Sequence, residues 1–267
     1  MTRPVPAEPV SLRAVALPAE HGGWGLLGEP LALALVLAPS WAGFGIAVGC
    51  LAAFLLHHPL KLVLADLRRR ARYPRTGLAM RVAAGYAIAA GLGFFAAAAF
   101  TEGPFWAPLA LAAPLAAVQL GYGARNRGRF LVPEIVGALA LAGAAPAILL
   151  AAGWPASAAA VVWTLLAARA AGSIIYIRAR LRRDRGQGGS AAAPLAVHVA
   201  AAAGVAALAV VGQAPWAAVA AFLLLLVRAG WGLSPWHDVV RPRTVGFQEL
   251  GFGAASTALL ALGFLLR

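Results

Sequence analysis

Nine long apolar runs constrain this chain more than any other feature. The length of each run is close to that of a helix that crosses the hydrocarbon of a bilayer, about 20 residues. The chain is 62% hydrophobic and 12% charged, which leaves too little polar surface for a water-soluble domain of 267 residues. We therefore predict an all-α polytopic membrane protein with nine transmembrane helices. The runs cover residues 23–40, 41–62, 78–100, 105–122, 131–153, 156–177, 192–212, 216–233 and 245–266.

The connectors between these runs alternate in kind, and this alternation predicts the orientation. Short, almost uncharged connectors alternate with connectors rich in arginine. Of the 22 Lys and Arg residues, Arg267 alone falls on the far side of this topology, so 21 lie at or toward one face. An excess of Lys and Arg marks the cytoplasmic side. We expect residues 1–22 to form a cytoplasmic tail and residues 23–267 a single transmembrane domain whose C-terminus lies outside.

Net charge and cysteine usage narrow the class of partner. A formal charge of +13 in a soluble chain would suggest nucleic acid, but these arginines lie between apolar runs. We therefore predict no nucleic-acid partner and expect membrane lipids instead. The single Cys50 allows no disulfide framework. Motifs for nucleotide, zinc or nucleophilic hydrolase sites are absent from the sequence, so we predict no metal site and no cofactor, with a haem or quinone partner near the histidines as the alternative. The oligomeric state is left open.

Two polar rims follow apolar runs on the predicted cytoplasmic face. The first is HHPLKLVLADLRRRARYPRTGLAMR over residues 57–81, and the second is SIIYIRARLRRDR over residues 173–185. Guanidinium groups pair bidentately with phosphate oxygens, so the rims together predict a site for a phosphorylated lipid. The candidate ligand-binding residues here and in the 120–130 segment are Lys61, Asp66, Arg72, Arg75, Tyr122, Arg125, Asn126, Tyr176, Arg178 and Arg182, with His57 and His58 as catalytic candidates.

Ionisable residues inside the spans form a second candidate layer. Charge in hydrocarbon is costly and usually faces a bundle interior or a wet cavity. Counted from the cytoplasmic ends, the acidic residues and the histidine of this layer lie about 6 to 10 Å deep at 1.5 Å per residue. We expect a cavity open to the cytoplasm, with ligand contacts from Glu29, Arg169 and Arg228, and with Glu134 or Glu249 as a base. The layer comprises Glu29, Glu134, Arg169, His198, Arg228 and Glu249.

A structural role for the same layer is the alternative. Paired charges such as Glu134 with Arg169, or Glu249 with Arg228, would lock helices together without a ligand. Glu20 and His21, in the string PAEHGGWGLLGEP, present the same choice at the start of the first span. They either line the mouth of the cavity as ligand-binding groups or precede a helix start that Trp24 anchors at the interface.

Five stretches resemble the YwiC-like family of bacterial membrane proteins. They are PAEHGGWGLL, HHPLKLVLADLRRRARYPRT, GYGARNRGRFLVPEIVGALALAG, SIIYIRARLRRDRG and RPRTVGFQELGFG. The resemblance runs over nearly the whole chain. It implies a multi-pass protein of the bacterial cytoplasmic (inner) membrane and no particular activity, while the N-in and C-out orientation follows from the distribution of arginine.

The topology is also distantly similar to UbiA-type prenyltransferases, whose two Asp-rich motifs hold a prenyl diphosphate through magnesium. That resemblance implies a UbiA-like bundle with His57, His58 and Lys61 at the positions of the first motif. Asp66 and Asp184 are then isolated carboxylates. Magnesium is held by carboxylates, waters and phosphate oxygens. We therefore expect direct binding of a phosphate by arginine, without metal.

Three functions follow from these patterns. The first is a membrane protein that binds a lipid or isoprenoid phosphate in a cytoplasm-facing cavity, and whether it is an enzyme is left open. The second is a transporter or flippase that uses the buried Glu and Arg layer for coupling. The third is a non-catalytic membrane assembly protein.

Overall fold

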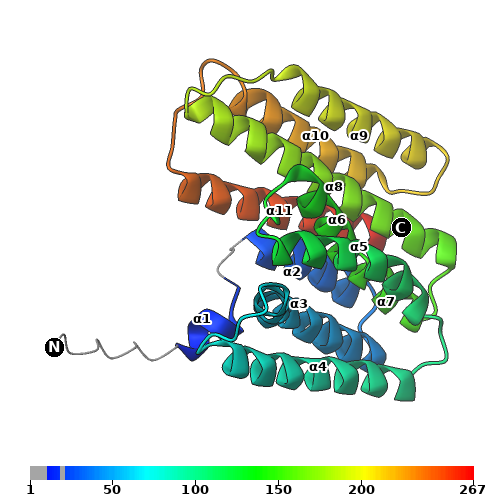
Figure 1. The fold of residues 1–267 in the computed structure, drawn as a ribbon. Helices are drawn as coiled ribbons and strands as arrows, with labels where there is room; N and C mark the ends of the chain where they lie inside the picture. The colour runs from blue at the N-terminus through cyan, green and yellow to red at the C-terminus, as the bar shows by residue number, and fades with distance from the viewer. Residues whose placement is uncertain (1–10, 19–21) are drawn as a thin grey trace.

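The computed structural model describes residues 11–18 and 22–267, and every regular element in that part is a helix. Most of the helices lie side by side in one bundle (Figure 1). The elements are α1 (Leu12–Ala16), α2 (Gly22–Leu37), α3 (Trp41–Arg68), α4 (Thr76–Ala99), α5 (Trp106–Ala124), α6 (Leu131–Ala142), α7 (Ala144–Ala151), α8 (Ala156–Asp184), α9 (Ala192–Val210), α10 (Trp216–Gly232) and α11 (Pro242–Leu265).

Seven helical segments are long and apolar enough to cross a membrane, which supports the predicted class. One of them is the combined run Leu131–Ala151, in which α6 and α7 meet at Gly143. The two other predicted spans correspond to α2 and α10, which are apolar but only 16 and 17 residues long in the described part of the chain. The structure therefore supports a polytopic helical protein, with seven long segments and two shorter apolar helices.

Both polar rims are helical for longer than the sequence predicted. The second predicted span ends at residue 62, but α3 continues to Arg68; the sixth ends at residue 177, but α8 continues to Asp184. Leu, Arg and Lys are good helix formers, so the helices outlast their apolar segments. The charged last turns of α3 and α8 thus extend beyond the apolar segments that precede them.

The core of the bundle lies around α7 and the first half of α8. All residues from Ala144 to Leu150 in α7 are buried, including Ile148 and Leu149 at 0% exposure. At the edge of the bundle, α3 and α4 approach closely through glycines. A Cβ atom added at Gly93 would lie 2.6 Å from the backbone nitrogen of Gly49. Small residues at a helix contact allow this close packing in membrane proteins.

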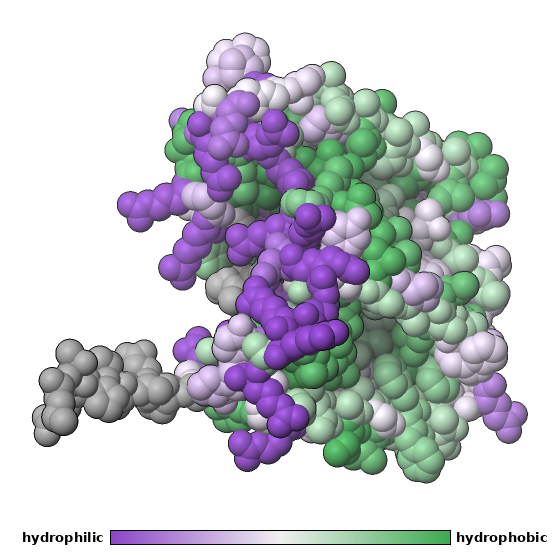
Figure 2. All heavy atoms as spheres, viewed as in Figure 1, coloured by the Kyte–Doolittle hydropathy of each residue, from purple (hydrophilic) through white to green (hydrophobic). Residues whose placement is uncertain are grey.

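The outer faces of the bundle are apolar. Ile88, Leu92 and Phe95 on α4 are 64%, 63% and 76% exposed, a pattern suited to lipid contact. Most of the hydrophilic residues visible in Figure 2 gather on the side of the molecule where α1 lies. We call this side the arginine-rich end and define it by residues 68–75, 125–130 and 178–187.

Candidate functional site

Asp66 anchors the loop between α3 and α4 at the arginine-rich end. Its side chain is fully buried, and its two oxygens accept hydrogen bonds from Arg75 Nη2 at 2.9 Å and Thr76 Oγ1 at 2.8 Å. The backbone N–H of Tyr73 donates in turn to Thr76 Oγ1 at 3.0 Å. Two of the predicted ligand-binding residues, Asp66 and Arg75, therefore bind each other. Arg72, in the same loop, is exposed and forms no ion pair with any residue that the structure describes.

Arg178 on α8 ties the α5–α6 loop to the second rim. Its Nη1 donates to the carbonyl oxygen of Arg129 at 2.8 Å and to Glu134 Oε2 at 2.7 Å. The sequence suggested Arg169 as the partner of Glu134, and that pairing is wrong because Arg169 contacts Glu29 instead. Arg178 keeps 40% of its side chain exposed, so the pair lies at an accessible surface.

The other candidates of the α5–α6 segment lie around the same turn. Arg125 is exposed and donates to the carbonyl of Gly121 at the end of α5, at 3.2 Å. Asn126 adopts a left-handed conformation with φ of 57°, which suits a turn. Tyr122 is half-buried, and its carbonyl oxygen accepts from the N–H of Arg127 at 2.9 Å.

The adjacent histidines of α3 point to different neighbours. His58 Nε2 lies 3.1 Å from the carbonyl oxygen of Ala14 in α1. His57 faces α5, because its Nε2 lies 3.9 Å from the place that a Cβ atom would take at Gly123. The aliphatic part of Lys61 packs at the same glycine, with its Cδ 2.9 Å from that place. His57 and His58 therefore do not form one paired site.

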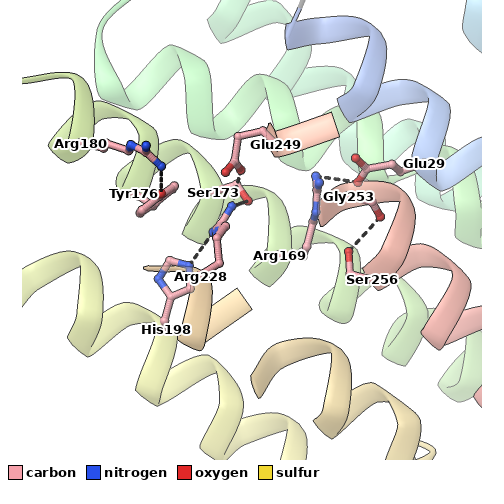
Figure 3. A network of polar contacts seen from close by, with 10 residues as sticks. All are labelled: Glu29, Arg169, Ser173, Tyr176, Arg180, His198, Arg228, Glu249, Gly253 and Ser256. Carbon is pink, nitrogen blue, oxygen red and sulfur yellow. Dashed lines mark hydrogen bonds and ion pairs between the residues drawn. The ribbon is translucent and has the colours of Figure 1, made fainter. Parts of the chain in front are cut away.

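A buried polar network crosses the interior of the bundle (Figure 3). Glu29 on α2 and Arg169 on α8 form an ion pair at 2.6 Å. Arg228 on α10 forms a second ion pair with Glu249 on α11. All four residues are at most 9% exposed. The network thus joins four helices by two opposite-charge pairs, and a buried charge left without its partner would cost several kcal/mol, about 3 to 5.

His198 on α9 completes the surroundings of Arg228. Its Nδ1 lies 2.8 Å from the carbonyl oxygen of Pro194, which can only accept, so the proton is assigned to Nδ1. Nε2 then accepts from Arg228 Nη2 at 3.0 Å, which requires a neutral ring. The guanidinium of Arg228 also lies over the ring of Tyr176, 4.2 Å from its centroid. The hydroxyl of Tyr176 accepts from Arg180 Nη1 at 2.8 Å.

Glycine is required where the network passes between helices. A Cβ atom at Gly253 on α11 would collide with the carboxylate of Glu29 and the guanidinium of Arg169. A Cβ atom at Gly232 on α10 would collide with the hydroxyl of Tyr176. Neither glycine was predicted, although Gly253 follows Glu249 by four residues and so shares its helix face.

A further polar group at the arginine-rich end was also missed. His237, in the α10–α11 loop, places Nε2 at 2.7 Å from Asp184 Oδ1 and Nδ1 at 2.6 Å from the carbonyl oxygen of Ser234. The other oxygen of Asp184 lies 3.9 Å from Nε of Arg180. Asp184 is therefore engaged by two neighbours, and it ties the end of α8 to the loop.

The interior layer is organised as ion pairs. Five of the six residues of the predicted layer are buried in one network, and the sixth, Glu134, lies apart from it with Arg178. Of the two pairs that the sequence suggested, Glu249 with Arg228 is present. Two surface pockets, one beside Trp163 and one beside Trp216, are lined by other residues.

The remaining candidates either do not gather or cannot be placed. The catalytic candidates Glu134 and Glu249 have different partners, on α8 and α10. Arg182 is exposed at the end of α8, one turn beyond Arg178. Glu20 and His21 lie outside the described residues. Among the residues that the structure does describe, no group of three His, Cys, Asp or Glu side chains is placed to hold a metal ion.

Part of the chain matches the model of a known protein family. The family model described as YwiC-like protein matches residues 17–149. No curated protein and no solved structure matches the chain. The matched part contains the polar rim of α3, the α5–α6 loop and α6, whereas the rim of α8 and the start of α11 lie outside it. Over residues 17–149, the chain belongs to the YwiC-like family.

Proposed function

We propose that this protein binds the phosphate headgroup of a membrane lipid at its arginine-rich end, through guanidinium groups and without metal. The bridge from Arg178 to the α5–α6 loop carries this proposal. Arg178 donates to the carbonyl of Arg129 at 2.8 Å, so the arginines of the α5–α6 loop lie near the last turns of α8. Arg182 lies one turn after Arg178 on the same helix. Phosphate oxygens suit such a cluster because each guanidinium offers two parallel N–H donors.

The charge balance at this end supports an anionic ligand. Asp66, Glu134 and Asp184 are each already engaged by an arginine or a histidine of the protein. Several exposed arginines have no carboxylate within ion-pair distance among the described residues. They are Arg68, Arg69, Arg72, Arg125, Arg127, Arg182 and Arg185.

The chemistry of the donors supports binding without metal. Magnesium requires several oxygen ligands, mostly carboxylates, waters and phosphate oxygens. Among the described residues of this end, the side chains of Asp66 and Asp184 are buried and each is paired with a cationic side chain or a histidine. Glu134 is more accessible, but Arg178 pairs with it. Asp238 is exposed and forms no ion pair within the described part of the chain. A metal ion would have to displace these cations, whereas a phosphate group needs only the free guanidinium groups.

The same proposal includes a bundle of nine spans, arranged as in UbiA-type proteins but without Asp-rich motifs, in the bacterial inner membrane. The short helices α2 and α10 would be about 24 and 26 Å long at 1.5 Å per residue. A hydrocarbon core of about 30 Å adapts to such a difference by local thinning at modest cost. The excess of arginine supports a cytoplasmic position for the arginine-rich end.

The buried ion pairs favour lipid binding over the transporter alternative. Coupling groups of a transporter usually face a water-filled path. Here Glu29 contacts Arg169, and Glu249 contacts Arg228, inside a packed network. We therefore assign these four residues to the scaffold that supports the arginine-rich end.

Ligand-induced stabilisation tests the proposal. The detergent-solubilised protein is mixed with phosphatidylglycerol or phosphatidylcholine of equal chain length, both in EDTA, and its thermal unfolding is followed. A ligand at 100 times its Kd stabilises the folded state by about 2.7 kcal/mol. We expect a rise in Tm with phosphatidylglycerol that Arg125→Ala/Arg182→Ala removes. The matched control, Arg241→Ala/Arg243→Ala, removes the same charge from the start of α11 and should keep the rise. A rise that requires magnesium would contradict metal-free binding.

A further inference from the structure

A groove beside the break between α6 and α7 suggests where the chain of such a lipid lies. The groove has a volume of about 130 Å³ and opens at the surface of the bundle. It is lined by Leu115, Leu139, Trp163, Thr164 and Ala167, from α5, α6 and α8. Small-molecule sites usually measure about 300 to 1,000 Å³, so a groove of this size suits a segment of one hydrocarbon chain.

The walls of the groove are apolar because the backbone polar groups at the helix break are hydrogen-bonded within the protein. At the break, the N–H of Gly143 donates to the carbonyl of Ala140 instead of that of Leu139. The carbonyl of Leu139 accepts from the indole Nε1 of Trp163 at 3.1 Å. Thr164 Oγ1 donates to the carbonyl of Ala160 at 2.8 Å. An unsatisfied carbonyl in hydrocarbon would cost several kcal/mol. With these bonds made, the groove presents hydrocarbon and the indole ring.

One face of α8 connects the groove to Arg178. Ala167, Ala171, Ile174 and Arg178 follow each other at spacings of four, three and four residues, which places them on one stripe of the helix. All four are half-buried, so each keeps part of its side chain exposed. Arg178 lies eleven residues after Ala167, which is a distance of about 16 Å along the helix at 1.5 Å per residue. One leaflet contributes about 15 Å to a hydrocarbon core of about 30 Å, so the two ends of the stripe match the headgroup and the chain end of one lipid.

We infer that the groove holds one acyl chain of an anionic glycerophospholipid whose phosphate lies at Arg178 and the α5–α6 loop. This inference rests on the proposed phosphate binding and extends it by naming the class of lipid and the path of its chain. Charge complementarity selects the occupant: the headgroup end of the stripe carries arginines, and the groove end carries no charge. An apolar chain alone would use the groove but not the arginines.

Photo-crosslinking tests the path of the chain. Phosphatidylglycerol with a diazirine near the end of one acyl chain is added to the full-length protein in nanodiscs, and the labelled peptides are identified by mass spectrometry. We expect labelling around Leu139 and Trp163 that Ala167→Trp or Thr164→Trp reduces at least fivefold. The matched control, Ala87→Trp on the exposed face of α4, should leave it unchanged. Phosphatidylcholine with the same chain should label the groove several-fold less.

Different results would contradict the position of the acyl chain and the binding of the headgroup. If phosphatidylglycerol still raises the Tm but labels other helices, the inference about the groove is overturned while phosphate binding stands. If phosphatidylcholine labels the groove as strongly as phosphatidylglycerol, the groove holds bulk lipid and the inference is wrong. If phosphatidylglycerol neither raises the Tm nor labels the groove, the proposed phosphate binding fails together with this inference.

Discussion

Glu29 of α2 and Arg169 of α8 form a buried ion pair at 2.6 Å, and the backbone of α11 passes them at Gly253. Three helices that are distant in the sequence therefore meet at one pair of charges. The pair lies in the same network as Arg228 and Glu249, which add α10 to the contact (Figure 3). This arrangement fixes how the C-terminal helices pack on α2.

Removing one charge of the pair should be worse than removing both. Arg169→Met leaves Glu29 buried and unpaired, and we expect a loss of about 3 to 5 kcal/mol in the free energy of unfolding. The double variant Glu29→Met/Arg169→Met replaces the pair by apolar side chains and should be clearly more stable than Arg169→Met alone. Denaturant titration in mild detergent measures the difference. A double variant as unstable as the sum of the two single variants would contradict the pairing.

Gly253 should not tolerate a side chain. An added methyl group would collide with both Glu29 and Arg169. We expect Gly253→Ala to destabilise the protein by about 1 to 3 kcal/mol through overpacking. Gly251→Ala on the same helix is the matched control, because nothing lies within 4 Å of its added Cβ. That control should be neutral or stabilising, since alanine favours a helix by about 1 kcal/mol over glycine. Equal Tm values for the two variants would refute the close contact at Gly253.

Asp66 should control the loop between α3 and α4. Asp66→Asn keeps the size of the side chain but removes the charge that Arg75 contacts at 2.9 Å, and we expect a loss of about 1 to 3 kcal/mol. Limited proteolysis at Arg68–Arg72 should become faster in this variant. Asp238→Asn, in the α10–α11 loop, removes a charge without an ion pair in the described part of the chain and should leave the cleavage rate unchanged. Unchanged cleavage in Asp66→Asn would show that the carboxylate does not hold the loop.

The orientation can be tested at two exposed positions. Gln187, in the α8–α9 loop, should be cytoplasmic, and Glu102, in the α4–α5 loop, should be external. Each is replaced by cysteine in a Cys50→Ala background and treated with a membrane-impermeant maleimide in intact cells. We expect labelling of Glu102→Cys only. Labelling of Gln187→Cys from outside would reverse the topology.

The helical class was predictable because apolar runs of spanning length allow few other structures. The inward position of the ionisable residues was also predictable, since a charge such as Glu29 inside an apolar run must face other protein or water. Their partners were not predictable. Which arginine meets Glu29 or Glu134 depends on the rotation of each helix, and a sequence of mostly alanine and leucine does not specify that rotation.

Other features depend on contacts between distant segments. His57 and His58 are adjacent in sequence, but they face α5 and α1 because successive residues of a helix point about 100° apart. The need for glycine at Gly253 and the link from His237 to Asp184 become visible only once the helices are packed. The polar layer suggested a cavity from depth alone, whereas its members neutralise each other in the structure.

Native mass spectrometry of the gently purified protein in EDTA tests whether the arginines bind a lipid phosphate directly, without metal. We expect a retained anionic phospholipid that survives the chelator, is lost from Arg125→Ala/Arg182→Ala, and remains on Arg241→Ala/Arg243→Ala. Retention that disappears with EDTA, or equal retention by both double variants, would contradict direct binding of the phosphate by the arginines of the α5–α6 loop and α8.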